Sequence, residues 1–209
     1  MTPDQIYQLV EVDFGATDQM IRMHLNSQVP LTNTISDYII SNGGKRIRPL
    51  LTLLLAKALG YQGSDHHTLA AIIEIIHTAT LLHDDVVDNS GLRRGKQTAN
   101  IVWNNPEAVL SGDFLYSKAF VLMAHLRIAD AMIILTESTN RIADGEMLQL
   151  LNIRNVNVTE AGYFDVIYHK TAKLFEAACI LPACLVQSDQ PQQSALEAFG
   201  RHLGTAFQL

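Results

Sequence analysis

The sequence has little cysteine, proline or glycine, and these shortages narrow the choice of fold. Its 2 cysteines, Cys179 and Cys184, lie in an apolar stretch without metal-ligand companions, where buried free thiols in a reducing cytoplasm are expected. The 6 prolines and 12 glycines do not separate short, evenly spaced strands, which disfavours an all-β fold. We therefore expect one all-α domain spanning residues 1–209.

The sequence also lacks an excess of cations and any long, uninterrupted apolar run. A net charge of −6 disfavours a general nucleic-acid surface, because such a surface needs a basic face. The N-terminus has neither the basic nor the apolar region of a signal peptide. The most apolar windows, residues 50–59 and 70–82, are too short and too polar to span a bilayer. These absences predict a cytoplasmic protein with no nucleic-acid partner and no transmembrane segment.

Apolar residues recur at helical spacing along most of the chain. Helices are predicted at about residues 17–41, 49–59, 65–88, 107–126, 128–151, 159–187 and 192–209. Pro30 is expected to bend the first of these or to take the first position of a new helix, and Pro182 is expected to kink another. The last helix reaches Leu209 without a stop signal, so the chain is expected to be C-terminally truncated.

The stretch HTATLLHDDVVD, residues 77–88, ends an apolar helix in carboxylates. Asp84 and Asp88 are four residues apart and share a helix face, with Asp85 about 100° round. Two such carboxylates repel each other unless a cation lies between them, and Mg²⁺ is usually held by one or two carboxylates, waters and substrate phosphates. The motif alone is equally compatible with a Mg²⁺-diphosphate site and with a solvated helix end.

Two groups of cations accompany this motif. Arg93 and Arg94 follow the helix, and their guanidinium groups suit phosphate oxygens, although a salt bridge to Asp84 or Asp88 is the alternative. His77 lies seven residues before Asp84, roughly 10 Å along the axis, where it would donate to a second anion or be an ordinary core residue.

The stretch GGKRIRP, residues 43–49, places Lys45, Arg46 and Arg48 on a glycine-led turn at a helix N-terminus, which favours anions. Its spacing is not that of a P-loop. Lys170 and Thr171 form a weaker pair that would close on a phosphate or lie on the surface. An acidic patch, basic clusters and an apolar helix face together predict substrates with diphosphate heads and apolar tails.

Several stretches resemble the trans-isoprenyl (polyprenyl) diphosphate synthase family, and most closely its bacterial octaprenyl-forming members. They are GGKRIRP, HTATLLHDDVVD with LRRG, GDFLYSKAF, IADGEMLQL, YHKTAKLFEAA and GTAFQL, in order from about Ile21 to the end. The resemblance implies an all-α, isoprenoid synthase-type helical bundle around a central cavity, usually a homodimer. It also implies a Mg²⁺-dependent transferase that condenses isopentenyl diphosphate with an allylic prenyl diphosphate. The implied product is a long all-trans polyprenyl diphosphate for quinone side chains.

The resemblance also assigns roles to residues. Asp84 and Asp88, with help from Asp85, would hold Mg²⁺ and the allylic diphosphate during catalysis. The residues implied to bind isopentenyl diphosphate are Lys45, Arg48, His77 and Arg94, and those implied to bind the allylic diphosphate are Arg93, Lys170, Thr171 and Gln208.

Product length depends on the residues just before the acidic motif. Thr80 and Ala79 lie four and five residues before Asp84, where short-chain family members often carry aromatic residues that block the tunnel. Small residues predict an open tunnel and a product of C30 to C50, with C40 favoured. Phe120 and Met123 are candidates for the tunnel floor, or are ordinary core residues.

The chain departs from the family at its C-terminus. It corresponds to the N-terminal two-thirds of a family member, and the second aspartate-rich motif that should follow Leu209 is absent. An inactive fragment or a non-catalytic partner subunit is therefore an alternative. Another alternative is an HD-type metal phosphohydrolase built on His83 and Asp84 with His66, His67 and His77. It is disfavoured because His77 and His83 point about 120° apart on a helix.

Overall fold

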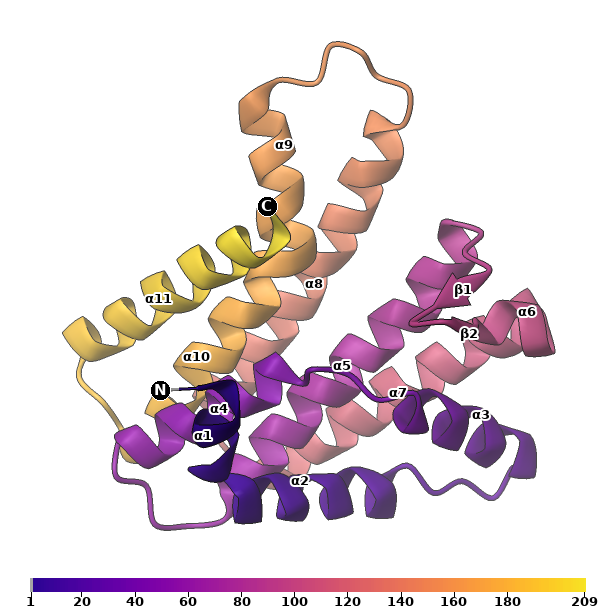
Figure 1. Cartoon of the computed structure of the whole chain (residues 1–209). Helices are drawn as coiled ribbons and strands as arrows, with labels where there is room; N and C mark the ends of the chain where they lie inside the picture. Colours follow the sequence, from indigo (N-terminus) through magenta and orange to yellow (C-terminus); the bar gives the residue numbers. More distant parts are fainter. Residues whose placement is uncertain (1) are drawn as a thin grey trace.

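The computed structural model describes residues 2–209, which are almost entirely helical (Figure 1). The helices are α1 (Pro3–Gln8), α2 (Glu11–His24), α3 (Pro30–Ser41), α4 (Ile47–Ala58), α5 (Asp65–Val87), α6 (Ala99–Trp103), α7 (Asn105–Leu126), α8 (Ala129–Asn152), α9 (Glu160–Ile167), a π-helical turn (Tyr168–Ala172), α10 (Lys173–Val186) and α11 (Gln190–Gln208). The strands are β1 (Leu92–Arg93) and β2 (Lys96–Gln97). The predicted all-α fold class is confirmed.

Helix α5 runs through the middle of the bundle and is packed by α2, α4, α7 and α10 (Figure 1). Its apolar residues do not follow one stripe but surround the helix, as expected for a helix buried on several sides. Ile72, Ile73 and Ile76 are completely buried, and each such side chain contributes roughly 1.5–3 kcal/mol by leaving water. The core therefore fixes the position of the acidic motif at the C-terminal end of α5.

Two local features refine the sequence expectations. Of the two roles expected for Pro30, the structure shows the first position of a new helix, because the chain leaves α2 after His24 and α3 begins at Pro30. The second feature is the unpredicted hairpin of β1 and β2, whose two turn residues, Arg94 and Gly95, both have positive φ. This hairpin separates two adjacent arginines, placing Arg93 in a strand and Arg94 in the turn.

Helix α11 packs against α10 and the π-helical turn through glycines. A Cβ atom on Gly200 would lie 2.6 Å from Glu176 Cα, and one on Gly204 would lie 2.6 Å from Ala172 Cα. The backbones therefore touch where a larger residue would separate them. Among residues 2–209, no helix combines the length and apolar character needed to cross a bilayer.

Candidate functional site

The three aspartates of the acidic motif lie in different environments at the end of α5. Asp85 is buried, Asp88 is exposed, and the Asp84 side chain is 15 % exposed. Gln149 of α8 lies 3.5 Å from Asp88, at the limit of a hydrogen bond. The motif thus presents Asp84 inward and Asp88 outward.

Asp84 shares its surroundings with Glu146 of α8. Lys170 Nζ lies 2.7 Å from a Glu146 oxygen and 3.5 Å from an Asp84 oxygen, so one ammonium group faces two carboxylates. Burial and the neighbouring Glu146 charge raise the pKa of Asp84 to about 7, although Lys170 opposes the shift. Burial alone would lower the pKa of Lys170, but its hydrogen bond to Glu146 and the charge of Asp84 raise it. The single positive charge of Lys170 therefore does not fully compensate the two carboxylates of Asp84 and Glu146.

This donor set fits a hard divalent cation. Asp84, Glu146 and Asp88 offer carboxylate oxygens, the ligands that Mg²⁺ and Ca²⁺ prefer. A divalent cation would relieve the repulsion between Asp84 and Glu146 that raises the pKa of Asp84. The residues present are thus suited to hold a hard divalent cation beside Asp84.

Asp85 has a different partner from the other two aspartates. Arg93 donates to both of its carboxylate oxygens, with Nε at 3.0 and 3.1 Å and Nη2 at 2.8 Å. The sequence left open a salt bridge to Asp84 or Asp88 as the alternative to phosphate binding. The structure shows an arginine salt bridge to the neighbouring Asp85 instead, because the hairpin directs Arg93 toward the buried face of α5. Asp85 thereby holds Arg93 at the edge of the site.

The basic turn before α4 is held by acidic residues. Arg46, which adopts a left-handed conformation with φ of 44°, forms an ion pair with Asp18 of α2 and lies 3.9 Å from Glu74. Arg46 is thus occupied by the protein itself and anchors the turn.

Arg48 lies deeper in the site. Its guanidinium stands 4.4 Å above the ring of Phe175, and its Nη1 lies 3.2 Å from His77 Nε2. Burial lowers the pKa of Arg48 to about 10, which still leaves it cationic at neutral pH. An arginine with few polar partners in a buried position is suited to pair with an anionic ligand.

Burial and the nearby Arg48, Arg94 and Arg93 charges lower the pKa of His77 well below its ordinary value, so the ring is neutral. Since Nε2 faces the donor Arg48, Nε2 acts as the acceptor and Nδ1 carries the proton.

Glu74 is the shared counter-ion of these cations. Burial raises the pKa of this carboxyl group, while Arg46, Arg48 and Arg94 lower it less strongly. The Arg94 guanidinium lies directly against the backbone of Gly44, in space that a Cβ atom at that position would fill. Glycine at this turn therefore admits an arginine from the hairpin into the site.

Ten of the predicted residues line one cavity of about 670 Å³. They are Lys45, Arg48, His77, Thr80, Asp84, Arg93, Arg94, Lys170, Thr171 and Gln208. They come from the turn before α4 and the first turn of α4, from α5, from the hairpin, from the π-helical turn and from α11. The cavity is also lined by Glu146, which shares Lys170 with Asp84, and by the apolar side chains of Leu81, Phe175 and Phe207.

The π-helical turn places Lys170 and Thr171 at this cavity. Such turns are frequent at functional sites because they redirect side chains within a helix. Gly145 of α8 allows the backbone of Lys170 to approach, since a Cβ atom at Gly145 would lie 2.6 Å from Lys170 N. Thr171 Oγ1 donates to Gln208 Oε1 at 3.0 Å, which ties the end of α11 to the cavity.

The residues predicted for a chain-length tunnel do not lie together. Thr80 borders the central cavity, and Phe120 borders a wider hollow of about 950 Å³ with Tyr116 and His83. Ala79 and Met123 are buried in the apolar core instead, because they belong to the packed region shared by α5 and α7. Neither Ala79 nor Met123 lines either of these hollows, and their tunnel role stays a prediction.

The histidines do not converge on a shared metal position at this site. His77 contacts Arg48, and His83 faces Asp113 at 3.4 Å and Val109 O at 3.1 Å. His66 and His67 lie at the opposite end of α5. This separation does not support the HD-type arrangement.

Sequence reasoning did not assign a role to Glu146, Gln149 or Glu74. Glu146 and Gln149 lie within IADGEMLQL and face the acidic motif from α8. Their spacing of three residues on one helix face, next to a small glycine, is the signal that could have identified them. Glu74 was visible as the only charge in an apolar run, and its position among three arginines explains why a charge is tolerated there.

The family model of the polyprenyl synthetases ("Polyprenyl synthetase") matches residues 29–209. Octaprenyl diphosphate synthase of Escherichia coli is 48 % identical over 209 residues, which are 100 % of this chain and 65 % of that protein. A nonaprenyl diphosphate synthase of Rhodobacter capsulatus is 46 % identical over 204 residues, covering 96 % of this chain and 62 % of that protein. The chain thus spans slightly less than two thirds of these relatives.

Solved structures show the same relationship. A decaprenyl diphosphate synthase from Rhodobacter capsulatus superposes with a TM-score of 0.97 at 43 % identity, covering 99 % of this chain and 64 % of that one. A polyprenyl synthase from Caulobacter crescentus, complexed with calcium and isoprenyl diphosphate, superposes with a TM-score of 0.96 at 40 % identity, covering 99 % and 63 %.

Proposed function

Because the chain belongs to the polyprenyl synthetase family, we propose that it carries the substrate site of a Mg²⁺-dependent trans-prenyltransferase. The reaction joins isopentenyl diphosphate to an allylic prenyl diphosphate. The most direct support is that one cavity is lined both by Asp84 and Glu146, two carboxylates with too little positive charge nearby, and by several cationic side chains. Two diphosphates need such a combination, since one leaves with metal assistance and the other is only bound.

The carboxylate side of the cavity would take the allylic diphosphate. Asp84 would hold Mg²⁺ with Glu146 and Asp88, and Asp85 would act by positioning Arg93. A bound Mg²⁺ supplies Lewis-acid stabilisation of the leaving diphosphate. Lys170, Thr171, Arg93 and Gln208 would donate to its oxygens, since all four line the cavity.

The basic side would take isopentenyl diphosphate. Lys45, Arg48 and Arg94 would neutralise its charge, while the Nδ1–H group of His77 would donate a hydrogen bond. Glu74 would keep the arginines in place without competing for the ligand, because its charge is shared among three of them. The neutral state of His77 spares the site an additional buried cation when no ligand is bound.

We propose an all-trans product of octaprenyl length, used for quinone side chains, because the E. coli relative is an octaprenyl diphosphate synthase. Thr80 is the small residue that borders the cavity beside Asp84. Thr80→Phe should therefore shorten the product and leave folding intact. Ala79→Phe should mainly destabilise the fold, by about 1–3 kcal/mol, because Ala79 is fully buried in the core. Unchanged products from a folded Thr80→Phe variant would contradict this position of the growing chain.

We also propose a cytoplasmic homodimer. Helices α7 and α8 expose apolar side chains, including Leu110, Val121 and Ile133, that a second copy would cover. Light scattering coupled to gel filtration would test this, and a monomer at micromolar concentration would contradict it.

The activity is tested with farnesyl diphosphate, radiolabelled isopentenyl diphosphate and Mg²⁺, followed by chromatography of the products. Calorimetric titration with farnesyl thiodiphosphate measures substrate binding without turnover. Elongation, or Mg²⁺-dependent binding that disappears in Asp84→Asn, supports the proposal. Binding without elongation would favour a non-catalytic partner or an incomplete enzyme, and a folded chain that neither binds nor elongates would overturn the proposal. Asp165→Asn, an exposed carboxylate of α9, is the matched control.

A further inference from the structure

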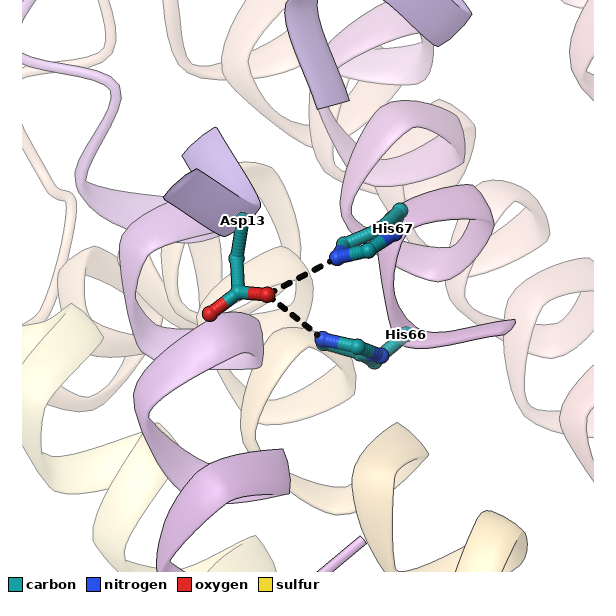
Figure 2. A group of neighbouring side chains, drawn as sticks. All are labelled: Asp13, His66 and His67. Carbon is teal, nitrogen blue, oxygen red and sulfur yellow. Dashed lines mark hydrogen bonds and ion pairs between the residues drawn. The ribbon is translucent and has the colours of Figure 1, made fainter. Parts of the chain in front are cut away.

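A second cluster of ligand-type side chains lies at the N-terminal end of α5, far from the cavity. Asp13 of α2 faces His66 and His67 of α5, and both rings point an Nε2 atom at the same carboxylate oxygen (Figure 2). The distances from Asp13 Oδ1 are 3.3 Å to His66 and 2.9 Å to His67. Seventeen residues separate His67 from Asp84, which corresponds to roughly 26 Å along α5.

The ligand atoms of this cluster are spaced as around one small metal ion. One ligand atom from each residue lies within 4.8 Å of the other two. A tetrahedral ion bound at about 2.0 Å separates its ligand atoms by roughly 3.3 Å, close to both observed distances. We propose that Asp13, His66 and His67 form a binding site for a divalent transition-metal ion of the zinc type, which joins α2 to α5.

The kind of ligand decides the kind of ion. Two imidazoles and one carboxylate suit Zn²⁺, Co²⁺ or Ni²⁺, whereas Mg²⁺ and Ca²⁺ prefer oxygen ligands alone. Three protein ligands leave at least one coordination position for water. The cluster therefore selects a different ion from the carboxylates at the other end of the helix.

The surroundings hold the ligands in the required form. The His66 ring is packed edge-on against Tyr61 at 5.5 Å and lies 4.0 Å from the His67 ring, measured between centroids. The Nε2 atoms of both rings are thereby held facing Asp13 Oδ1. Asp13 and His67 keep side-chain exposures of 27 % and 18 %, so an ion can enter from solvent.

A metal ion at this site would stabilise the packing of α2 against α5. Residues 13 and 66 are 53 positions apart in the sequence, so the ion would close a long loop between α2 and α5. Helix α2 also carries Asp18, which pairs with Arg46 of the basic turn. The proposed ion would thus fix the helix that anchors this turn while contacting neither substrate.

The test uses the full chain after removal of metals with EDTA. Zn²⁺ is titrated by calorimetry in excess Mg²⁺, so that the oxygen ligands of the acidic motif are already supplied with their preferred ion. One Zn²⁺ per chain should bind, and saturating Zn²⁺ should raise the melting temperature by about 5 °C. His67→Gln keeps a donor for Asp13 but removes the imidazole ligand, and it should weaken binding by at least roughly 10- to 100-fold, the loss typical of an outer-shell partner alone.

Two control variants assign the binding to this cluster. His125→Gln, at an exposed histidine of α7, and Asp84→Asn should both bind Zn²⁺ as the unchanged chain does. An unchanged affinity for Zn²⁺ in a folded His67→Gln variant, or loss of Zn²⁺ binding in Asp84→Asn, would overturn the proposal.

If His67→Gln does not fold, the unchanged chain still gives an answer through Co²⁺. Bound Co²⁺ should shift the imidazole N–H proton resonances of exactly two histidines. Absence of those signals would leave only a hydrogen-bonded Asp13 and would reject the metal site.

Discussion

The two ends of α5 use carboxylates in opposite ways. At the N-terminal end, burial alone would raise the pKa of Asp13, but hydrogen bonds from His67 and His66 lower it below its ordinary value. At the C-terminal end, burial and Glu146 raise the pKa of Asp84 to about 7. One end is satisfied by the protein, whereas the other is incomplete without a cation. The two ends therefore differ in the metal-free chain, because histidine hydrogen bonds already stabilise the carboxylate of Asp13, whereas Asp84 lacks sufficient compensation until a cation binds.

The largest effect should come from removing the carboxylate at the incomplete end. Asp84→Asn keeps the shape of the side chain but loses the charge that would hold Mg²⁺. We expect elongation to fall about 100- to 1000-fold, as for the loss of one electrostatic stabiliser of a transition state. The measurement is the rate of isopentenyl diphosphate incorporation, with Asp165→Asn as the control. A loss below tenfold would mean that Asp84 is not a central ligand.

The second effect tests how the cations near that end are held. Glu74→Gln removes the charge that Arg46, Arg48 and Arg94 share, while Arg46 keeps its ion pair with Asp18. Burial raises the pKa of Glu74 despite the three arginines, so folding favours the neutral side chain, and the free energy of unfolding at neutral pH should rise in this variant. Urea denaturation followed by circular dichroism measures this, with the exposed Glu137→Gln as the control. A fall in stability relative to the control would show that the attraction of the arginines outweighs the burial of this charge.

The third effect concerns pH, and its sign follows from the raised pKa of Asp84. The unfolded carboxyl group ionises near 3.8, whereas the folded one ionises near 7, so the folded state binds more protons between these values. Metal-free stability should therefore fall as pH rises through this window. Asp84→Asn should escape the decline, so its advantage over the unchanged chain should grow by on the order of 2 kcal/mol between about pH 5 and 8. If the stability of Asp84→Asn and that of the unchanged chain in EDTA change in parallel with pH, the raised pKa of Asp84 would be contradicted.

The fold could be predicted from the sequence because its signals are local. The apolar spacing identified α5, α7 and α8 within a few residues, and Pro30 indicated a boundary. The tunnel positions were harder, because counting residues along α5 does not reveal which side packs against α7. Ala79 and Thr80 are neighbours in sequence, yet only Thr80 reaches the cavity.

Pairings between distant segments could not be predicted. The partner of Arg93 depends on a hairpin. The sequence LRRGKQ gives little indication that its two turn residues adopt positive φ. Glu146 and Lys170 meet Asp84 only because α8 packs against the π-helical turn and α10, while α10 packs against α5. The motifs supplied the members of the site, but tertiary contacts decided which charges are compensated and which are not.

The smallest effect is expected at the N-terminal end of α5. Removing the carboxylate there should lower the metal-free stability, whereas Asp84→Asn should raise it at neutral pH. Asp13→Asn removes the acceptor of two histidine hydrogen bonds, so metal-free stability at pH 7 should fall by about 1–2 kcal/mol. Because folding lowers the pKa of Asp13, its contribution is present above the ordinary value of 3.8 and is lost as pH falls through the folded value. Glu11→Gln removes an equal charge from the same first turn of α2 without a histidine partner, so it is the matched control. A gain in stability for Asp13→Asn would mean that both ends of α5 hold strained carboxylates, and the contrast between them would be lost.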